Sequence, residues 1–274
     1  RQVVAGAQHI TFGDPDFFNG IGHAIPLIEQ FHHEFPHITY DVTIKIEHLK
    51  KYEPQVPLLK ATGCLFVISA VESIDDTVLA ALDKGHTRED FLQVSASLRA
   101  KDLTLHPTFV PFTPWTTLES YLDLLRVLYR EDLVGNVAPI QLGIRLLIPE
   151  GSRMLQLDEI RRGVGPFDPQ SLVYPWKNID LRVDALSETI QQIASAADRE
   201  KQTRTIAFQR IWQTAHQAAG IQPPELLPRG SSRPVPFLSE PWYCCAEPTA
   251  DQLISIGMPK KSPIASVVSA DNFV

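Results

Sequence analysis

Short apolar runs alternate with amphipathic stretches over the first 150 residues of the chain. The run from Cys64 to Ser69 is continuously apolar up to its last residue, which is typical of a strand buried on both faces of a parallel sheet. Apolar runs of this kind predict five strands, at residues 8–12, 39–46, 64–69, 104–110 and 140–148. Amphipathic stretches between them predict helices at 23–34, 54–62, 75–82, 88–101 and 118–131. The alternation predicts repeated βα units on one parallel sheet.

Local signals refine the ends of these elements. Residues 1–5 are interpreted as the end of a further helix, which Gly6 closes as a C-cap. Thr116 or Thr117 is positioned to cap the helix at 118–131. Right-handed crossovers would curl the strands into an open barrel, with the loops that follow the strands gathered on one face. We expect functional groups on that face.

The pattern changes after about residue 150. Residues 151–184 are rich in turn residues and predict a loop region, whereas residues 186–219 predict one long helix or two collinear helices. Their apolar positions would pack against the barrel and comprise Leu186, Ile190, Ile193, Ala197, Ile206, Ile211 and Ala215. We therefore expect three parts: a barrel region at 1–152, a loop and helical extension at 153–222, and an irregular proline-rich tail at 223–274 that carries a Cys-Cys motif.

Composition narrows the classes of function. A formal net charge of −7 argues against a nucleic-acid partner, because phosphate binding needs clustered Lys and Arg. No apolar run reaches the roughly 20 residues that span a bilayer, so no membrane partner is expected. The three cysteines, Cys64, Cys244 and Cys245, are too few for a disulfide framework, which favours a reducing, cytoplasmic setting. The chain starts at Arg1 without an initiating methionine, so we expect a processed form or a fragment.

The segment His33-Glu34-Phe35-Pro36-His37 matches the H-E-x-x-H pattern of zinc peptidases. That chemistry needs both histidines on one helix face, with the glutamate polarising a zinc-bound water. Pro36 lies between them, and proline inside a helix costs about 3 kcal/mol. The helix should therefore end near Glu34. A zinc metallohydrolase is kept as an alternative of a different chemistry.

Three stretches together resemble the radical S-adenosylmethionine (SAM) superfamily. His9-Ile-Thr-Phe-Gly-Asp-Pro-Asp-Phe-Phe18 resembles the end of the superfamily's second barrel strand. Lys60-Ala-Thr-Gly-Cys-Leu-Phe-Val-Ile-Ser-Ala-Val-Glu-Ser73 is similar to its fourth strand, with Ala70 where glycine is usual. Thr108-Phe-Val-Pro-Phe-Thr-Pro-Trp-Thr-Thr117 and Arg145-Leu-Leu-Ile-Pro-Glu-Gly-Ser152 resemble the fifth and sixth strands. The resemblance covers about residues 1–152.

This resemblance implies an α/β fold, a partial (β/α)6-type TIM-like barrel that lacks its first strand, followed by a C-terminal helical segment and an irregular tail. It implies a pocket for SAM lined by Gly13, Asp14, Asp16, Lys45, Glu72, Ser73, Thr108 and Arg145. Asp14 and Asp16 would accept from the amino group of SAM, or equally belong to a solvated Asp-rich loop. Glu72 and Ser73 would lie at a strand's mouth. Lys45 and Glu47 on the third barrel strand would point into the cavity, or equally form a structural ion pair.

The superfamily binds a [4Fe–4S] cluster through a C-x-x-x-C-x-x-C loop after the first strand, and none of the three cysteines here has that spacing. The cluster ligands are therefore expected upstream of Arg1, no metal ligand is assigned in this chain, and the chain alone is expected to be inactive. The parent protein is expected to cleave SAM reductively and act on a small-molecule or peptide substrate, with a reductant protein as a possible partner.

The segment Trp242-Tyr-Cys-Cys-Ala-Glu-Pro248 matches the tail of a radical SAM subgroup named for its CCAEP or CUAEP ending, in which U is selenocysteine. The match implies that Cys244 and Cys245 are a catalytic thiol pair for substrate, metal or redox chemistry. Two alternatives remain open: packing of two small residues beside Trp242, and a non-catalytic thiol redox or metal-binding module with this pair as its only chemistry.

Overall fold

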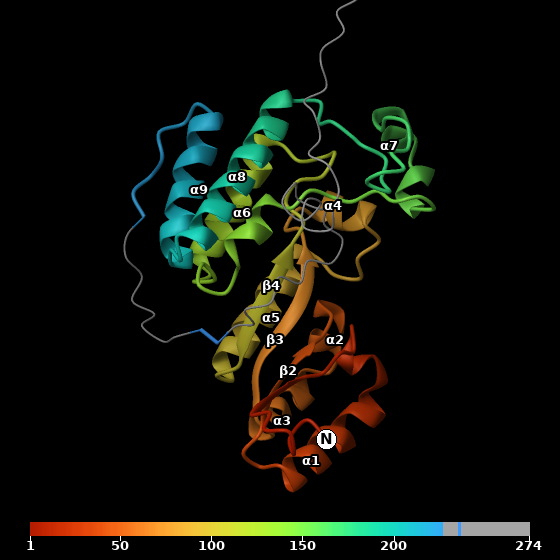
Figure 1. The fold of residues 1–274 in the computed structure, drawn as a ribbon, viewed down its shortest axis with the longest axis vertical. Coiled ribbons are helices and arrows are strands. Elements are labelled where there is room, and N and C mark those ends of the chain that lie inside the picture. The colour runs from red at the N-terminus through yellow and green to blue at the C-terminus, as the bar shows by residue number, and fades with distance from the viewer. Residues whose placement is uncertain (227–234, 237–274) are drawn as a thin grey trace, which may run out of the picture.

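The computed structural model describes residues 1–226 and 235–236 of the chain. Its central element is a parallel sheet in the order β1-β2-β3-β4. The strands are β1 (His9–Thr11), β2 (Thr39–Thr43), β3 (Cys64–Glu72) and β4 (Thr104–Phe109). β3 and β4 are the longest, and Figure 1 shows them running side by side with their arrowheads towards α4 (Asp76–Ala81). The predicted α/β class with a parallel sheet is confirmed.

Five helices lie between successive strands: α1 (Ile21–Glu34), α2 (Ile46–Lys51), α3 (Val56–Ala61), α4 and α5 (Arg88–Ala100). Four described helices follow β4: α6 (Leu118–Arg130), α7 (Asp158–Gly163), α8 (Leu181–Arg199) and α9 (Arg204–Ala218). The amphipathic stretches predicted most of them, but α2 begins inside the strand expected at 39–46, and α7 lies in the loop region expected at 151–184. Short 3-10 helices complete them: η1 (Phe17–Gly20), η2 (Glu53–Gln55), η3 (Pro139–Gly143) and η4 (Arg153–Gln156). The side chain of Thr117, not Thr116, accepts from the Ser120 amide and caps α6. Residues 1–5 form a single turn, after which Gly6 has a φ of 100°.

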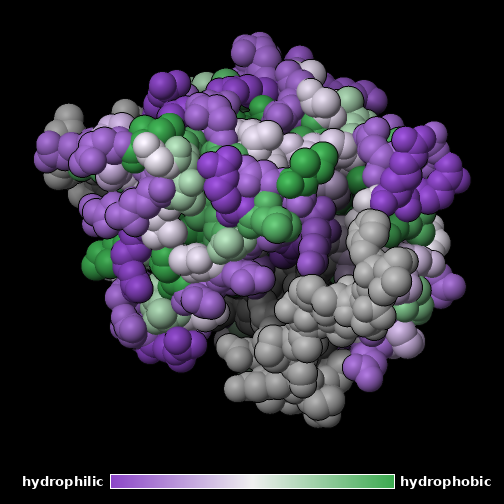
Figure 2. All heavy atoms as spheres, turned by 90° about the horizontal axis from the view of Figure 1, so that it is seen from above, coloured by the Kyte–Doolittle hydropathy of each residue, from purple (hydrophilic) through white to green (hydrophobic). Residues whose placement is uncertain are grey.

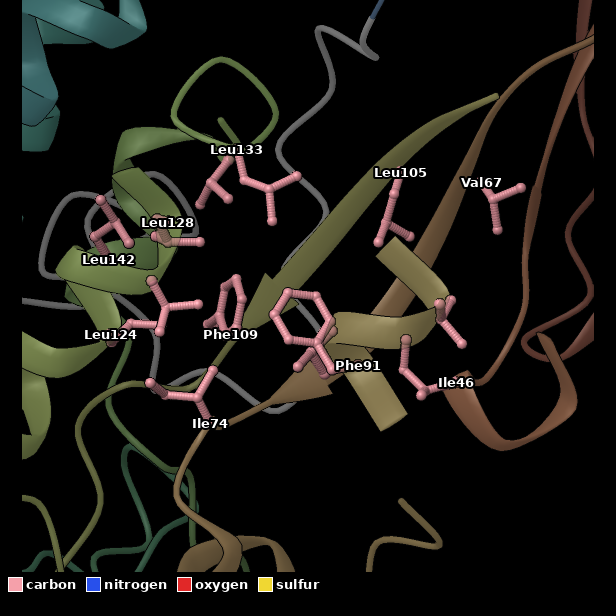
Figure 3. Close-up of a cluster of buried hydrophobic side chains, with 14 of the residues drawn as sticks. Ile46, Val67, Ile74, Phe91, Leu105, Phe109, Leu124, Leu128, Leu133 and Leu142 are labelled. Atoms are coloured by element: carbon pink, nitrogen blue, oxygen red, sulfur yellow. The ribbon is translucent and has the colours of Figure 1, made fainter. Parts of the chain in front are cut away.

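One face of the sheet is apolar and covered by helices. Tyr40 of β2 packs edge-on against Phe31 of α1, and its hydroxyl contacts Thr62 after α3 at 2.7 Å. Phe109 of β4 meets Phe91 of α5 with ring centroids 6.1 Å apart. Figure 3 shows these two rings side by side, with leucines of α6 beyond Phe109. This core covers one face of the sheet with α1, α3, α5 and α6.

The predicted strand at 140–148 is wrong over most of its length. Residues 139–143 form η3, and within the described part of the chain a parallel bridge between Phe112 and Arg145 continues the sheet's direction. Gly143 lies so close to α8 that an added Cβ would stand 3.0 Å from Gln191 Cγ, and Gln191 donates to the Gly143 carbonyl at 2.9 Å. Packing against α8 therefore replaces strand pairing. The described strands number four, and closure into a partial barrel stays a prediction.

Two further boundaries differ from expectation. β2 ends at Thr43, and α2 begins at Ile46 with Lys45 as its N-cap; Ile46 and Leu49 of α2 are buried. The predicted collinear helix at 186–219 is two helices that lie side by side in Figure 1. Lys201 has a φ of 52° between them, and the Thr203 side chain caps α9. Among the described residues, no helix is long and apolar enough to cross a membrane.

Candidate functional site

The carboxyl ends of the four parallel strands lie at one edge of the sheet, which we call the carboxyl edge. Residues 12–20, 44–45, 73–75 and 110–117 follow the strands there. Six of the eight predicted SAM-pocket residues belong to these segments or end a strand beside them: Gly13, Asp14, Asp16, Lys45, Glu72 and Ser73. Hydrophilic and hydrophobic residues are interspersed over the end of the molecule that Figure 2 views from above. The topology therefore brings most of the predicted pocket to one edge.

The two aspartates after β1 have different surroundings. Gly13 and Asp14 are exposed, and Asp14 Oδ1 accepts from the Asp16 amide at 2.9 Å, which fixes the turn. Asp16 is buried; its Oδ2 lies 2.8 Å from His48 Nδ1, and its Oδ1 accepts from the Lys45 amide at 3.2 Å. Asp16 thus ties the loop after β1 to α2. Asp14 is the carboxylate of the two that a ligand can reach.

Lys45 and Glu47 do not lie on a strand, because β2 ends before them. Lys45 Nζ lies 3.5 Å from Glu47 Oε1 and 3.8 Å from Asp16 Oδ2. The Lys45 side chain is 57% exposed, so this is a solvated ion pair and contributes about 0–1 kcal/mol. The expectation that both side chains point into a cavity from a strand is wrong; the expectation of an ion pair holds.

Glu72 ends β3 in a strained conformation. Its φ is 65°, in the left-handed region that few residues other than glycine adopt. The register with β4 shifts between Ala70 and Glu72. Its buried carboxylate accepts from Lys84 Nζ at 2.9 Å. Ser73 follows, and its Oγ accepts from the Asp75 amide at 3.0 Å. Strain of about 1–3 kcal/mol at a strand's end is concentrated at functional sites, which supports a role for this position.

The remaining two predicted pocket residues, Thr108 and Arg145, do not lie in the loops that follow β1, β2 and β3. Thr108 is half-buried on β4. The Arg145 guanidinium donates to Asp184 at 2.7 Å and to the Trp176 carbonyl at 3.0 Å, and it stacks 3.9 Å above the Trp176 ring. These contacts fasten the segment after η3 to α8. Its assignment to SAM binding stays a prediction.

The second face of the sheet, which we call the inner face, carries many polar side chains. The sequence analysis did not predict it. Registers between neighbouring strands place alternate residues of all four strands on it: His9, Thr11, Thr39, Asp41, Thr43, Phe66, Ile68, Ala70, Thr104, His106 and Thr108. Most are neither fully buried nor fully exposed. The signal in the sequence was a period of two in polar residues along three short strands.

Asp41 is the centre of the inner face and is 1% exposed. Its Oδ1 accepts from Thr11 at 2.7 Å and lies 2.9 Å from His9 Nε2, while His9 Nδ1 lies 2.8 Å from Thr39 Oγ1. Asp41 Oδ2 is buried with no hydrogen-bond partner among the described residues. His9 also stacks on Phe66, with centroids 6.0 Å apart. A buried carboxylate with an unused lone pair favours a donor that docks on this face.

No metal centre is formed by the described residues. Cys64 is buried, its Sγ donates to the Phe66 carbonyl, and burial raises the pKa of its thiol, so it does not fit a cluster ligand. Cys244 and Cys245 lie outside the described residues. α1 ends at Glu34, and no group of three or more His, Cys, Asp or Glu in residues 1–226 and 235–236 is arranged to hold a metal, which leaves the His33–His37 zinc alternative without support.

The chain was compared with known proteins. No family model matches it, and no curated protein does. Its fold is similar to the cobalamin-dependent S-adenosylmethionine radical enzyme OxsB with aqua-cobalamin bound, at a TM-score of 0.57 and 17% identity over 72% of this chain and 35% of that one. The form of OxsB with aqua-cobalamin and S-adenosylmethionine bound matches at a TM-score of 0.57 and 14% identity, over 78% of this chain and 43% of that one. The radical S-adenosylmethionine methyltransferase TsrM from Kitasatospora setae matches at 0.39 and 18% over 47% of this chain and 25% of its own. The chain thus spans less than half of these proteins, and the OxsB likeness shows a shared fold.

Proposed function

We propose that this chain is a major part of the barrel of a radical SAM enzyme. The shared fold with OxsB over most of the chain supports this, and the motif resemblance at successive strand ends supports the same superfamily. One observation carries the proposal. The stretches that resemble the superfamily's cofactor-binding segments, after β1 and at the ends of β3 and β4, come to one edge of one parallel sheet. Ligands bind at such edges in α/β folds.

The structure suggests distinct roles for the predicted pocket residues. Exposed Asp14 accepts from the ammonium of SAM, whereas Asp16 positions the loop through His48. Glu72 and Ser73 shape the pocket at the end of β3, where the Lys84 ion pair holds the Glu72 carboxylate. Bound SAM supplies a 5′-deoxyadenosyl radical when it is cleaved reductively. The chain's own task is to bind SAM and orient it against the inner face.

The proposal extends to parts that lie outside the described residues. The [4Fe–4S] ligands are assigned to a segment before Arg1, because Cys64 does not fit a ligand, and this chain alone is then inactive. The CCAEP tail makes the protein a member of that subgroup, with Cys244 and Cys245 as its thiol pair. A small molecule or peptide is the substrate, a reductant protein supplies the electron, and the setting is the cytoplasm.

The test uses protein made from the complete natural coding sequence, reconstituted anaerobically with iron and sulfide. Dithionite and SAM should then yield 5′-deoxyadenosine, and Asp14→Asn should raise the SAM concentration needed for half-maximal rate. Asp83→Asn is the matched control, because Asp83 is also an exposed aspartate but lies after α4, where it pairs with Arg153. Absence of both a cluster and 5′-deoxyadenosine in the complete protein would overturn the proposal.

A further inference from the structure

The end of β3 at the carboxyl edge is a strained turn. Glu72 has a φ of 65°, and the Ser73 amide donates to the Val71 carbonyl at 2.8 Å. A hydrogen bond between residues two apart, around a central residue with positive φ, defines the rare and strained form of the γ-turn. The Glu72 carbonyl still accepts from the Val110 amide at 2.9 Å. The turn therefore bends the chain while β3 stays paired, and neighbouring contacts must offset its strain.

Residues 84–86, which we call the clip, supply two such contacts. Lys84 Nζ donates to Glu72 Oε1 at 2.9 Å, and the two side chains are 30% and 10% exposed. His86 is buried, and its Nε2 lies 3.2 Å from the Val71 carbonyl. A carbonyl only accepts hydrogen bonds, so the imidazole donates. The clip therefore holds the strained residue by its side chain and by the peptide group that precedes it.

Both ends of the clip are fixed to helices. The Lys84 amide donates to the Leu79 carbonyl at 3.0 Å and so closes the C-terminal end of α4. The Thr87 side chain, directly after the clip, caps α5. The Arg88 amide donates to Asp76 Oδ1 at 2.7 Å, which ties the start of α5 to the start of α4. The clip therefore contacts β3 from a frame that two helices hold in place.

The middle of the clip approaches a different segment. A Cβ added at Gly85 would overlap Glu47 Oε2, so glycine permits an approach that any other residue would make only by displacing the Glu47 carboxylate. Glu47 pairs with Lys45, and Lys45 Nζ lies 3.8 Å from Asp16 Oδ2. The clip thus contacts, directly or through ion pairs, the segments that follow β1, β2 and β3.

Glu72 and Ser73 belong to the wall of a small cavity at the carboxyl edge. The loop after β4 and α6 complete this wall, with Thr113 and Tyr121 among its residues. The γ-turn sets the direction in which Ser73 leaves β3, so a relaxed Glu72 would move both residues of the wall. Because the clip fixes Glu72, it also fixes the shape of the cavity.

We propose that the clip is a positioning device for cofactor binding: Lys84 and His86 hold Glu72 in its left-handed conformation, and this conformation sets the affinity of the carboxyl edge for SAM. The holding of Glu72 rests on the contacts above, and its effect on SAM rests on the proposed function. Lys84 and His86 are positioning residues, because they act through Glu72 and Ser73.

The first experiment measures hydrogen–deuterium exchange in the complete natural protein without SAM. Lys84→Met and His86→Leu each remove one of the two donors that the clip provides. Each variant should raise the exchange rate in peptides covering 70–75 several-fold, because the γ-turn loses a contact that holds it. Exchange in α9 should not change, which shows that the fold is retained. Unchanged exchange at 70–75 in both variants would overturn the proposal.

Lys101→Met is the matched control. Lys101 is a lysine of similar exposure, 23%, and it pairs with Glu53 at the opposite end of α5 from the clip. The substitution removes a lysine–carboxylate pair without touching the clip, so exchange at 70–75 should equal that of wild type. A rise as large as in Lys84→Met would show that loss of any such pair loosens β3, and would overturn the proposal as well.

A second background separates strain from charge. Glycine adopts a φ of 65° without steric cost, so Glu72→Gly removes the strain that the clip opposes. His86 is bonded to the backbone of Val71, which this substitution leaves in place. His86→Leu should therefore add little to the exchange at 70–75 in the Glu72→Gly background. Equal effects of His86→Leu in both backgrounds would show that the clip opposes no strain.

The second experiment measures the dissociation constant of SAM in the complete protein, reconstituted with iron and sulfide. Lys84→Met should raise it about tenfold, because a charge-assisted hydrogen bond that fixes the pocket is lost. Lys84→Arg keeps the charge and a donor and should bind nearly as wild type does, as should Lys101→Met. The rate of 5′-deoxyadenosine formation at saturating SAM should not change, because Lys84 does not touch the reacting atoms.

The two experiments separate the clip from the proposed function. Faster exchange in Lys84→Met with unchanged SAM affinity would overturn the link between the clip and the cofactor. Wild-type protein that binds no SAM would overturn the proposed function and this link with it. The exchange measurements would still decide whether Lys84 and His86 hold Glu72, since they use no cofactor.

Discussion

Substituting Arg145 distinguishes a structural role of this residue from a role in cofactor binding. Its side chain is 14% exposed and that of its partner Asp184 is 17% exposed, with 2.7 Å between them. Removing one partner of a buried ion pair costs about 3–5 kcal/mol, because the other charge is left without compensation. Residual solvent access places the Arg145→Met variant near the lower value. Loss of the stacking on Trp176 adds about 1 kcal/mol.

The assay is urea unfolding of four proteins: wild type, Arg145→Met, Asp184→Asn and the double variant. We expect Arg145→Met to lower the free energy of unfolding by about 3–4 kcal/mol. The double-variant cycle should give a coupling energy of about 1–3 kcal/mol, as for residues in contact. Because Asp184 Oδ2 also accepts from the Asn178 amide at 3.0 Å, Asp184→Asn loses more than the ion pair.

An unchanged stability would refute this reasoning. If Arg145→Met unfolds within about 0.5 kcal/mol of wild type, which is the range of ordinary surface substitutions, the pair contributes nothing. If the same variant binds SAM more weakly, the residue serves the cofactor as the resemblance implied. Lost stability with unchanged SAM affinity would assign Arg145 to the structure.

Three further predictions follow from single contacts. Tyr121→Phe should lower the free energy of unfolding by about 1–3 kcal/mol in a denaturant titration, because the buried Leu142 carbonyl loses the donor 2.8 Å away; a loss below about 0.5 kcal/mol would contradict it. Burial lowers the pKa of His86, so on acidification the unfolded chain binds a proton at this residue before the folded chain does. The contribution of His86 to the free energy of unfolding is therefore full above about pH 6.5 and falls below it, by at most about 1.4 kcal/mol per pH unit. His86→Gln should flatten that part of a melting-temperature profile, and an unaltered profile would refute the assignment. His33→Ala should leave the zinc content of purified protein unchanged, and loss of stoichiometric zinc would revive the metallohydrolase alternative.

The sequence predicted those features that depend on interactions between neighbouring residues. The apolar run beginning at Cys64 became β3, and Thr117, one of the two threonines expected to cap the helix at 118–131, caps α6 through its side chain. α1 ends at Glu34, before Pro36, as proline geometry requires. These features depend on a few neighbouring residues, which a sequence displays directly.

Long-range packing decided what was missed. Close approach of Gly143 to Gln191 turned an expected strand into η3, although its apolar pattern suited a strand. The cluster around Asp41 joins residues about 30 positions apart, and the register of three strands is needed to find it. The different surroundings of Asp14 and Asp16 were also not visible in the sequence, because His48, which lies beside Asp16, is on a later helix.

The central claim is that the carboxyl edge of this sheet binds SAM. Hydrogen–deuterium exchange of the complete, reconstituted protein with and without saturating SAM tests it most directly. We predict slower exchange in peptides covering 12–20 and 70–75, which follow β1 and end β3, and unchanged exchange in α9. Protection confined to other segments, with residues 12–20 and 70–75 unchanged while SAM is bound, would contradict the claim.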